Sequence, residues 1–306
     1  MSRQAAVQKT SRITSINPAT GKEIASYEEM EPAEVARIIE QTHAAYLGWR
    51  KKSFTERAKP MKAAAKILHD RAEAFGKLMA EEMGKPISDG IGEVQKCAGG
   101  CDYFADNAER LLAREEIKTD AAKSFVTYQP LGVVLAVMPW NFPFWQVFRF
   151  VAPGLMAGNA GVLKHASNVQ GSALAIEKIL HEAGFPEHLF RTLVVSSRQI
   201  DRILENSLIC AATLTGSDAA GRAVASKAGA MLKKTVLELG GSDAYVVLGD
   251  ADLDKATTTS VKGRLVNTGQ SCIAAKRFIV TEKTRARFEE LFVAKMRAVT
   301  PGDPMD

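Results

Sequence analysis

Cysteine is scarce in this 306-residue sequence, with only four residues of this type, at positions 97, 101, 210 and 272. They are too few and too unevenly spaced for a disulfide framework, so we expect a reducing, cytoplasmic environment. Cys97 and Cys101 stand four residues apart without a second pair of ligands, which favours core packing over a zinc site. The sequence therefore predicts neither a disulfide-stapled fold nor a metal centre.

Long apolar runs are also missing. The longest weakly charged stretch, residues 131–163, is interrupted by Pro139, Pro143 and Pro153. It is typical of strand, turn and buried helix rather than of a membrane span. No charged segment followed by an apolar one opens the chain, so no signal peptide is predicted. We expect a protein without membrane contact.

Charge of one sign is not concentrated anywhere. The formal net charge is +5, spread along the chain, which argues against a nucleic-acid-binding role and weakly favours anionic small molecules. The hydrophobic content of 46% suffices for a sizeable core, and the length suggests two domains.

After Pro130, β-rich segments alternate with amphipathic helical segments. This order predicts an α/β fold with a Rossmann-like parallel sheet flanked by helices, in which ligands bind beyond the carboxyl ends of the strands. The predicted strands are 133–137, 161–163, 192–195, 211–214 and 235–239, and the predicted helices are 144–157, 170–183, 198–205 and 218–230.

Shorter patterns flank this alternating region. Two strands are predicted before it, over 13–16 and 23–27, followed by a helix starting at Pro32 and helices over 53–83 and 87–114. An extended, half-polar excursion is predicted over 118–128. Beyond Ser242 the predicted elements are a strand at 245–248, a helix at 253–266, a strand at 278–281 and a helix at 285–299.

Two segments carry groups that could perform chemistry together. Glu238 ends a β-rich run and precedes two glycines, within Leu237-Glu238-Leu239-Gly240-Gly241-Ser242. Cys272 follows a glycine-containing turn, Asn267-Thr268-Gly269-Gln270-Ser271. In one cleft, the thiolate can be acylated and the carboxylate can activate the water that releases the acyl group. The competing interpretations are a buried structural cysteine and a solvated strand end.

These two motifs, with Pro139-Trp140-Asn141-Phe142-Pro143, resemble the aldehyde dehydrogenase superfamily, and the wider pattern resembles its succinate-semialdehyde branch. The resemblance runs from Asn17 to Pro304 and implies that about the last third of the family fold, including part of the catalytic domain, is missing. It implies a dinucleotide-binding domain over 1–115 and 131–240, an oligomerisation hairpin over 116–130, and the start of a truncated catalytic domain over 241–306. It also implies a homo-oligomer, although the shortened chain need not assemble.

The same resemblance assigns the catalytic groups. Cys272 is the expected nucleophile, Glu238 the general base, and the Asn141 amide the donor to the oxyanion that forms when an aldehyde is attacked. A turn or capping role for Asn141 is the alternative. The expected reaction is oxidation of an aldehyde to its carboxylate.

The cofactor prediction is NADP or NAD, although no Gly-x-Gly-x-x-Gly follows a strand. Gly216 and Ser217 instead precede a helix whose N–H groups suit a pyrophosphate. Lys164 is expected to bind the ribose, and Ser167 stands where the family often has a glutamate that repels a 2′-phosphate, so NADP is expected to be accepted. The resemblance adds four more cofactor contacts: Met138, Pro139, Trp140 and Leu239.

Arg149 is the only charged residue between Leu131 and Leu163. A guanidinium among aromatics needs a partner, either an internal acid, solvent or the distal carboxylate of an acid-aldehyde. The resemblance favours succinate semialdehyde, with Trp145 and Gln146 beside it. Some relatives also have an arginine where this chain has Val266, and Arg264 is a candidate substitute.

A second hypothesis treats the chain as a truncated, catalytically impaired dinucleotide-binding module of the same family, because a split catalytic domain loses cofactor contacts and exposes apolar surface. A third is thiol-dependent hydrolysis without redox chemistry. Nicotinamide-independent activity would distinguish the third from the first.

Overall fold

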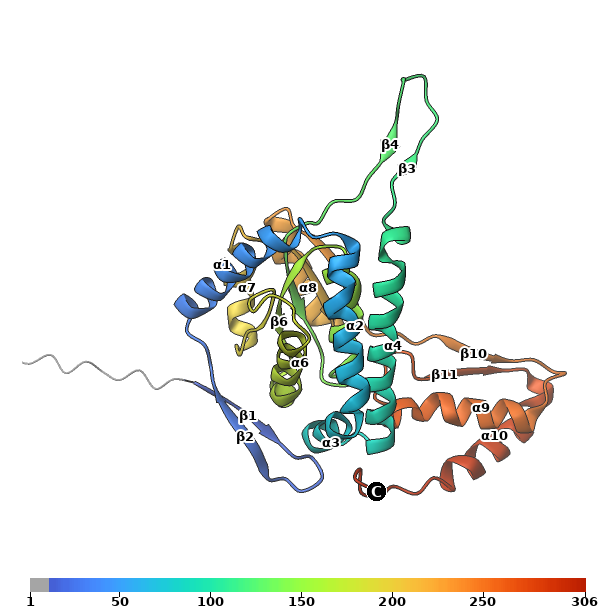
Figure 1. The fold of residues 1–306 in the computed structure, drawn as a ribbon. Coiled ribbons are helices and arrows are strands. Elements are labelled where there is room, and N and C mark those ends of the chain that lie inside the picture. The colour runs from blue at the N-terminus through green and yellow to red at the C-terminus, as the bar shows by residue number, and fades with distance from the viewer. Residues whose placement is uncertain (1–10) are drawn as a thin grey trace, which may run out of the picture.

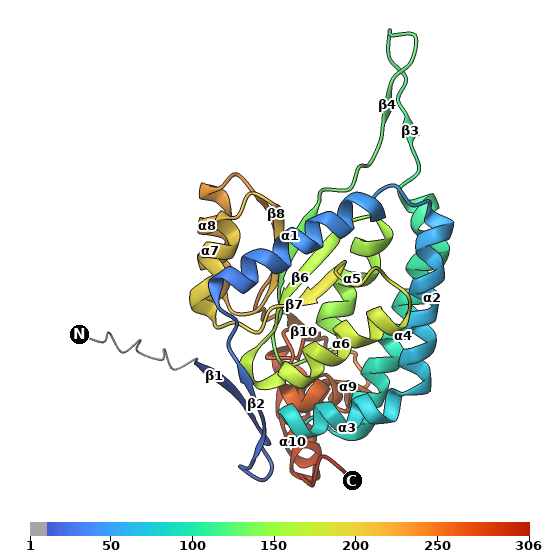
Figure 2. The same ribbon diagram turned by 60° about the vertical axis from the view of Figure 1, so that its left-hand side comes forward.

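A computed structural model describes residues 11–306, so the first ten residues of the predicted dinucleotide-binding domain lie outside it. Its centre is a five-stranded parallel sheet in the order β7-β6-β5-β8-β9, which confirms the predicted α/β fold (Figures 1 and 2). The strands are β5 (Val133–Val137), β6 (Ala160–Lys164), β7 (Phe190–Thr192), β8 (Ile209–Thr215) and β9 (Lys234–Glu238).

Burial differs between the middle and the edge of this sheet. The first four residues of both β5 and β6 are all buried, as expected of strands covered on both faces. Along β9 exposed and half-buried residues alternate, with Lys234, Val236 and Glu238 on the exposed face. One face of the β9 edge is therefore uncovered within the described part of the chain.

Helices from both ends of the chain pack around the sheet. α1 contacts β5, β6 and β7, and α8 contacts β8 and β9. The Trp49 indole of α1 donates a hydrogen bond of 2.9 Å to the Leu155 carbonyl of α5. The bounds are α1 (Pro32–Trp49), α5 (Trp145–Met156), α6 (Gln170–Glu182), α7 (Ile200–Glu205) and α8 (Asp218–Ala230), with short 3-10 helices at η1 (Ser167–Val169) and η2 (Ser197–Gln199).

Three helices form a separate layer beside α5: α2 (Phe54–Asp70), α3 (Ala72–Met83) and α4 (Ile87–Leu111). A capping box at Ser53 and Glu56 starts α2. The single helix predicted over 53–83 is wrong, because Arg71 leaves helical geometry at φ −118° and ψ 20°. The break occurs at an arginine, with neither glycine nor proline next to it, so the local sequence carries no signal for it.

One predicted strand is shifted. The strand expected at 192–195 is β7, Phe190–Thr192. The Val194 carbonyl instead accepts a hydrogen bond of 2.8 Å from the N–H of Met30. The backbone at Val194 therefore pairs with the N-terminal segment. Before Met30, both predicted strands are present as β1 (Arg12–Ile16) and β2 (Glu23–Glu28), and the structure pairs them antiparallel.

The last part of the chain forms a second, smaller unit. β10 (Ala244–Val247) and β11 (Arg277–Val280) pair in parallel, and α9 (Leu253–Leu265) packs against α10 (Glu282–Arg297). The 3-10 helix η3 (Val266–Gly269) leads to Cys272. The elements expected beyond Ser242 are thus present, each within a few residues of its predicted bounds.

A hairpin projects away from the rest of the molecule (Figures 1 and 2). Its strands β3 (Glu115–Glu116) and β4 (Phe125–Val126) are shorter than the extended segment predicted over 118–128. Ile117, Phe125, Val126 and Tyr128 are exposed on it.

Across residues 11–306, no helix combines the length and the apolarity that crossing a membrane requires. The same residues contain no group of three side chains placed to bind a metal. Cys97 and Cys101 are completely buried in the core, as predicted, and burial raises the pKa of both thiols. Cys210 is only partly buried.

Candidate active site

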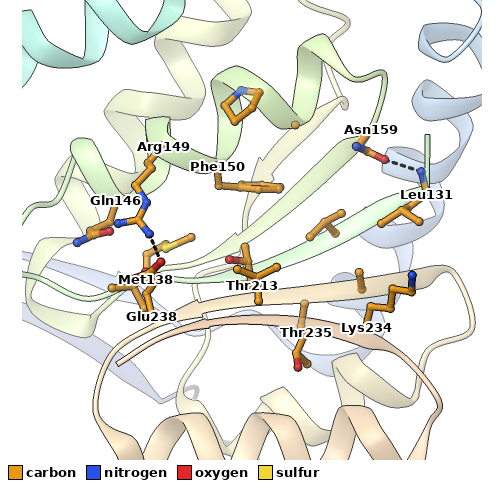
Figure 3. A pocket seen from close by; sticks show the side chains of 17 residues that line it. Leu131, Met138, Gln146, Arg149, Phe150, Asn159, Thr213, Lys234, Thr235 and Glu238 are labelled. Carbon is orange, nitrogen blue, oxygen red and sulfur yellow. Dashed lines mark hydrogen bonds and ion pairs between the residues drawn. The ribbon is translucent and has the colours of Figure 1, made fainter. Parts of the chain in front are cut away.

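Two adjoining cavities meet at the carboxyl end of β8, and one of them continues along the sheet as far as Leu131 and Lys234. The first, called here the thiol cavity, measures about 400 Å³ and is lined by residues 139–141, 215–217, 239–240 and 269–272. The second, called the sheet groove, measures about 470 Å³ and lies between α5 and the uncovered face of β8 and β9 (Figure 3). Gln146 and Thr215 line both cavities, so the two are neighbours.

The thiol cavity brings together the loops that follow three strands and the turn before Cys272. That turn is unusual, because Asn267, Thr268 and Gly269 all have positive φ, at 53°, 55° and 79°. Arg264 braces it by donating to the backbone carbonyls of Gly269 and Ala275, both at 2.9 Å. The Arg264 guanidinium is thus already hydrogen-bonded to the turn, which argues against its replacing the arginine that some relatives carry at position 266.

Asn141 links the loop after β5 to the cysteine turn. Its Nδ2 donates to the Gln270 carbonyl at 2.8 Å, and Asn267 Nδ2 donates to the Asn141 carbonyl at 2.8 Å. The buried Oδ1 of Asn141 and Oε1 of Gln146 have no partner in the described structure. Buried polar atoms without partners are rare, and a ligand in this cavity would offer them hydrogen bonds.

Cys272 is partly buried and lines the thiol cavity, as does the expected cofactor loop. The Lys276 ammonium donates to the Cys272 carbonyl at 2.7 Å, which fixes the backbone that carries the thiol. Leu239 reaches the same cavity because Gly221 on α8 leaves it space: a Cβ at Gly221 would lie 2.5 Å from Leu239 Cδ2. The structure therefore places Asn141 and Cys272 on one cavity.

Glu238 lies elsewhere. Its carboxylate forms an ion pair with the Arg149 guanidinium, 2.5 Å between Nη2 and Oε1, in the sheet groove (Figure 3). The expectation that Cys272 and Glu238 open onto a single cleft is not met in this conformation, since Glu238 lines only the groove. Successive side chains of a strand point to opposite faces of the sheet, so Glu238 lies on the face opposite Leu237. On that face the Arg149 guanidinium of α5 attracts the carboxylate.

Arg149 was expected among aromatics with an unidentified partner. Its side chain is 40% exposed and its partner is Glu238, so of the alternatives the structure shows the internal acid. At this exposure the pair is worth about 1 kcal/mol or less, which a ligand carboxylate can match. The weak ion pair therefore places Arg149 at the groove and leaves its guanidinium available to a ligand carboxylate.

The remaining predicted residues are dispersed. Pro139, Trp140, Gly216 and Ser217 line the thiol cavity, and Met138 lines the sheet groove. Trp145 lines neither cavity and lies below the Lys96 ammonium, 3.9 Å from its ring centroid. Lys164, the last residue of β6, and Ser167, the first of η1, also line neither. Lys164 is half-buried, and burial lowers its pKa.

The sequence interpretation gave no role to Thr215, Asn267 or Gln270, which also build the thiol cavity or its walls. Asn267 and Gln270 belong to the segment quoted around Cys272, so the motif itself was the available signal. Thr215 ends β8, at the strand end where ligands of parallel sheets are expected.

Comparisons with known proteins identify the family of the chain. Residues 5–306 match the model of the aldehyde dehydrogenase family. The chain belongs to the aldehyde dehydrogenase family. A probable NADP-dependent succinate-semialdehyde dehydrogenase from Synechocystis is 49% identical over 95% of this chain, and a succinate-semialdehyde dehydrogenase (NADP) from Mycobacterium avium is 49% identical over 96%.

The similarity extends to solved structures. Succinic semialdehyde dehydrogenase from Streptococcus pyogenes, in complex with NADP⁺, superposes with a TM-score of 0.93 and 37% identity, over 96% of this chain and 65% of that one. This aldehyde dehydrogenase chain spans 64% and 63% of the lengths of the Synechocystis and M. avium relatives. Its fold is thus the family fold over the part that it contains.

Proposed function

We propose that this protein oxidises an aldehyde, succinate semialdehyde, to its carboxylate with NADP⁺ or NAD⁺. The observation that carries the proposal is the meeting of Asn141 and Cys272 on one cavity with the start of α8. The names of the Synechocystis and M. avium relatives support the substrate and NADP.

The proposed chemistry assigns one role to each side chain. The Cys272 thiolate attacks the aldehyde carbon, forming a thiohemiacetal whose oxyanion accepts a hydrogen bond from the Asn141 amide. A bound nicotinamide cofactor would supply the hydride acceptor, so that the thiohemiacetal could become a thioester on Cys272. Glu238 then takes a proton from water, the hydroxide attacks the thioester, and carboxylate and thiolate are released. For this last step the Glu238 carboxylate must leave Arg149.

The residues present fit a dinucleotide. Helix α8 begins at Asp218 with Ser217 as its N-cap, and its N-terminal N–H groups can bind a pyrophosphate. Asn141 and Gln146, which line the thiol cavity, each have a buried side-chain oxygen without a partner that a carboxamide donor could satisfy. Lys164, whose ammonium pays a desolvation cost, can hydrogen-bond a ribose. Ser167, exposed at the start of η1, leaves room for a 2′-phosphate.

The domain roles are likewise proposals. We assign residues 1–115 and 131–240 to the cofactor-binding domain and 241–306 to the catalytic domain. The projecting hairpin, residues 116–130, is assigned to homo-oligomerisation because Phe125 and Val126 are exposed on it.

The substrate assignment can be tested with two aldehydes. Arg149→Met is expected to lower kcat/KM for succinate semialdehyde by about 10- to 100-fold, because the guanidinium no longer binds the distal carboxylate. The rate with butyraldehyde, which lacks that carboxylate, should stay within about 3-fold, the effect of one ordinary hydrogen bond. NADPH absorbance measures both.

Arg37→Met provides the matched control, since Arg37 is an exposed arginine on α1 that pairs with Glu34 at 3.7 Å and donates to Gln41 at 3.5 Å. Equal losses with the two aldehydes in Arg149→Met would contradict the carboxylate clamp. Absence of NADPH formation with either aldehyde in the unmodified chain would contradict the proposed oxidation.

Cofactor choice has its own test at Ser167. Ser167→Glu is expected to raise the Kd for NADP⁺ by about 10- to 100-fold, because a carboxylate replaces a donor beside the 2′-phosphate. The Kd for NAD⁺ should fall or stay constant, since its free hydroxyls can donate to the glutamate. Titration followed by Trp140 fluorescence measures both constants, and Ser167→Ala is the neutral control. A parallel change in the two constants would contradict a phosphate site here.

One observation favours a second candidate, binding without turnover. Apolar side chains are exposed on β9 and on the paired strands β10 and β11: Val236 at 63%, Val246 at 61% and Ile279 at 54%. Such surface marks a face that normally packs against another segment. NADP⁺ binding without NADPH formation would support this module hypothesis.

A further inference from the structure

The loop that carries Asn141, residues 138–145, is held from inside the protein by three buried polar side chains. Two of them, Lys85 and Glu93, form an ion pair at 1% and 2% side-chain exposure. The third, His165, is completely buried. All three come from segments distant in sequence from the loop, yet each contacts it.

Glu93 caps the helix that follows Asn141. Its Oε1 accepts the N–H groups of Phe144 and Trp145, both at 2.9 Å, where α5 begins. The N-terminal residue of α5 provides no side-chain cap of its own. A carboxylate from α4 therefore satisfies two of the free N–H groups of this helix, and its charge suits the helix N-terminus.

Lys85 holds that carboxylate and the loop together. Its ammonium binds the other oxygen of Glu93 and lies 4.1 Å from the centroid of the Phe142 ring. Burying two charges is expensive even when they pair, so such a pair adds little to stability. Here it fixes the position of the oxygen that receives α5 and of the aromatic ring beside Asn141.

His165 also contacts the loop through its ring nitrogens. Nε2 lies 2.9 Å from the Pro143 carbonyl, which can only accept, so the neutral ring carries its proton on Nε2 and donates it there. Nδ1 accepts the Ala166 N–H at 2.9 Å and lies 3.3 Å from the Met138 carbonyl. Burial lowers the pKa of His165 to about 4, which keeps this neutral form at neutral pH.

Beyond the loop, the contacts continue to the cysteine turn. Asn141 donates to the Gln270 carbonyl, and Asn267 donates to both the Asn141 and Gln270 carbonyls, at 2.8 and 3.2 Å. We propose that Lys85, Glu93 and His165 are positioning residues, which act through Asn141 on the geometry of the Cys272 turn. The inference rests on the proposed roles of Asn141 and Cys272, but its test needs neither cofactor nor turnover.

The test measures how fast iodoacetamide alkylates Cys272 in the full 306-residue chain, by peptide mass spectrometry. Cys210, partly buried in β8, is the internal reference, and Cys97 and Cys101 are inaccessible. Asn141→Ala sets the scale: we expect a rate about 3- to 10-fold lower, the effect of losing one hydrogen bond near a developing thiolate.

His165→Leu should lower the Cys272 rate by the same factor as Asn141→Ala. His165→Gln, which keeps a donor for Pro143, should restore it to within about 2-fold. The His165→Leu/Asn141→Ala double variant should react no more slowly than either single one, because both act through one contact. Rates that multiply in the double variant, or a Cys210 rate that changes in parallel, would overturn the proposal.

A second pair of variants is independent of His165. Lys85→Met/Glu93→Gln removes both charges but keeps an acceptor for Phe144 and Trp145, and should leave the Cys272 rate near that of the unmodified chain. Lys85→Met/Glu93→Leu removes the acceptor and should lower it as Asn141→Ala does. Equal rates in the two double variants would overturn the proposal. An unmodified chain without turnover would count against the proposed function alone.

Discussion

Cys272→Ala is expected to reduce aldehyde-dependent NADPH formation by about 10⁴-fold or more, because removing a nucleophile leaves no route to the thioester. The thiol lines the cavity that also contains Asn141 and the start of α8, and no second cysteine lines that cavity among the described residues. NADP⁺ binding should remain, since the expected pyrophosphate and ribose contacts are untouched. Stopped-flow absorbance and a binding titration measure the two quantities.

Cys210→Ala is the matched control for this prediction. Cys210 is the other cysteine with partial exposure, and it lies in β8 with its thiol near the Leu208 carbonyl. This variant should keep the activity of the unmodified chain. Substantial NADPH formation by Cys272→Ala would exclude covalent catalysis by this residue.

Glu238→Gln should separate acylation from release. Without a base for the attacking water, thioester hydrolysis is expected to slow by about 10²- to 10⁴-fold, while Cys272 still reacts with the aldehyde. The result should be a burst of NADPH close to one equivalent per active chain, followed by a slow steady rate. Acyl-enzyme on Cys272 should be visible by intact mass spectrometry.

The ion pair between Glu238 and Arg149 makes a control essential. Arg149→Met also breaks the pair but leaves the base in place, so it should show no burst. If Glu238→Gln turned over at the rate of the unmodified chain, Glu238 would not be the base. A burst in both variants would mean that pairing, rather than proton transfer, limits release.

The ion pair also connects the proposed acid-aldehyde preference with the proposed hydrolysis step. Arg149 is expected to bind the distal carboxylate of the substrate, and Glu238 occupies it in this structure. Because exposed pairs are weak, a substrate carboxylate can displace Glu238 at little cost. Displacement would free the base for the cavity next to the groove.

Much of the fold was accessible from local patterns. The β5 and β6 runs are apolar at every buried position, and Pro32, Ser53 and Gly84 mark helix ends where the structure has them. The two predictions that were wrong, the uninterrupted helix over 53–83 and the strand over 192–195, concerned backbone geometry that the local sequence does not determine. Arg71 breaks a helix without a breaker residue, and Val194 pairs with Met30, 164 positions earlier, instead of extending β7.

The candidate site, like the fold, combines features that local motifs predicted with features that they did not. The motifs around Asn141 and Cys272 predicted that these residues meet, and they line one cavity. The partner of Arg149 could not be read from its aromatic neighbours, because Glu238 is 89 positions away and reaches it only across the sheet edge. Nor does anything local to Lys85 or Glu93 distinguish them from solvated charges.

The sequence by itself determined the α/β class, the order of the strands and helices along the chain, and the residue types that can carry acylation, since periodicity and short motifs depend on near neighbours. Tertiary structure alone decided which cavity each side chain faces and which buried charges hold the Asn141 loop. The physical reason is that ion pairs and buried hydrogen bonds form between segments far apart in the chain, so their partners are chosen only when the core has packed.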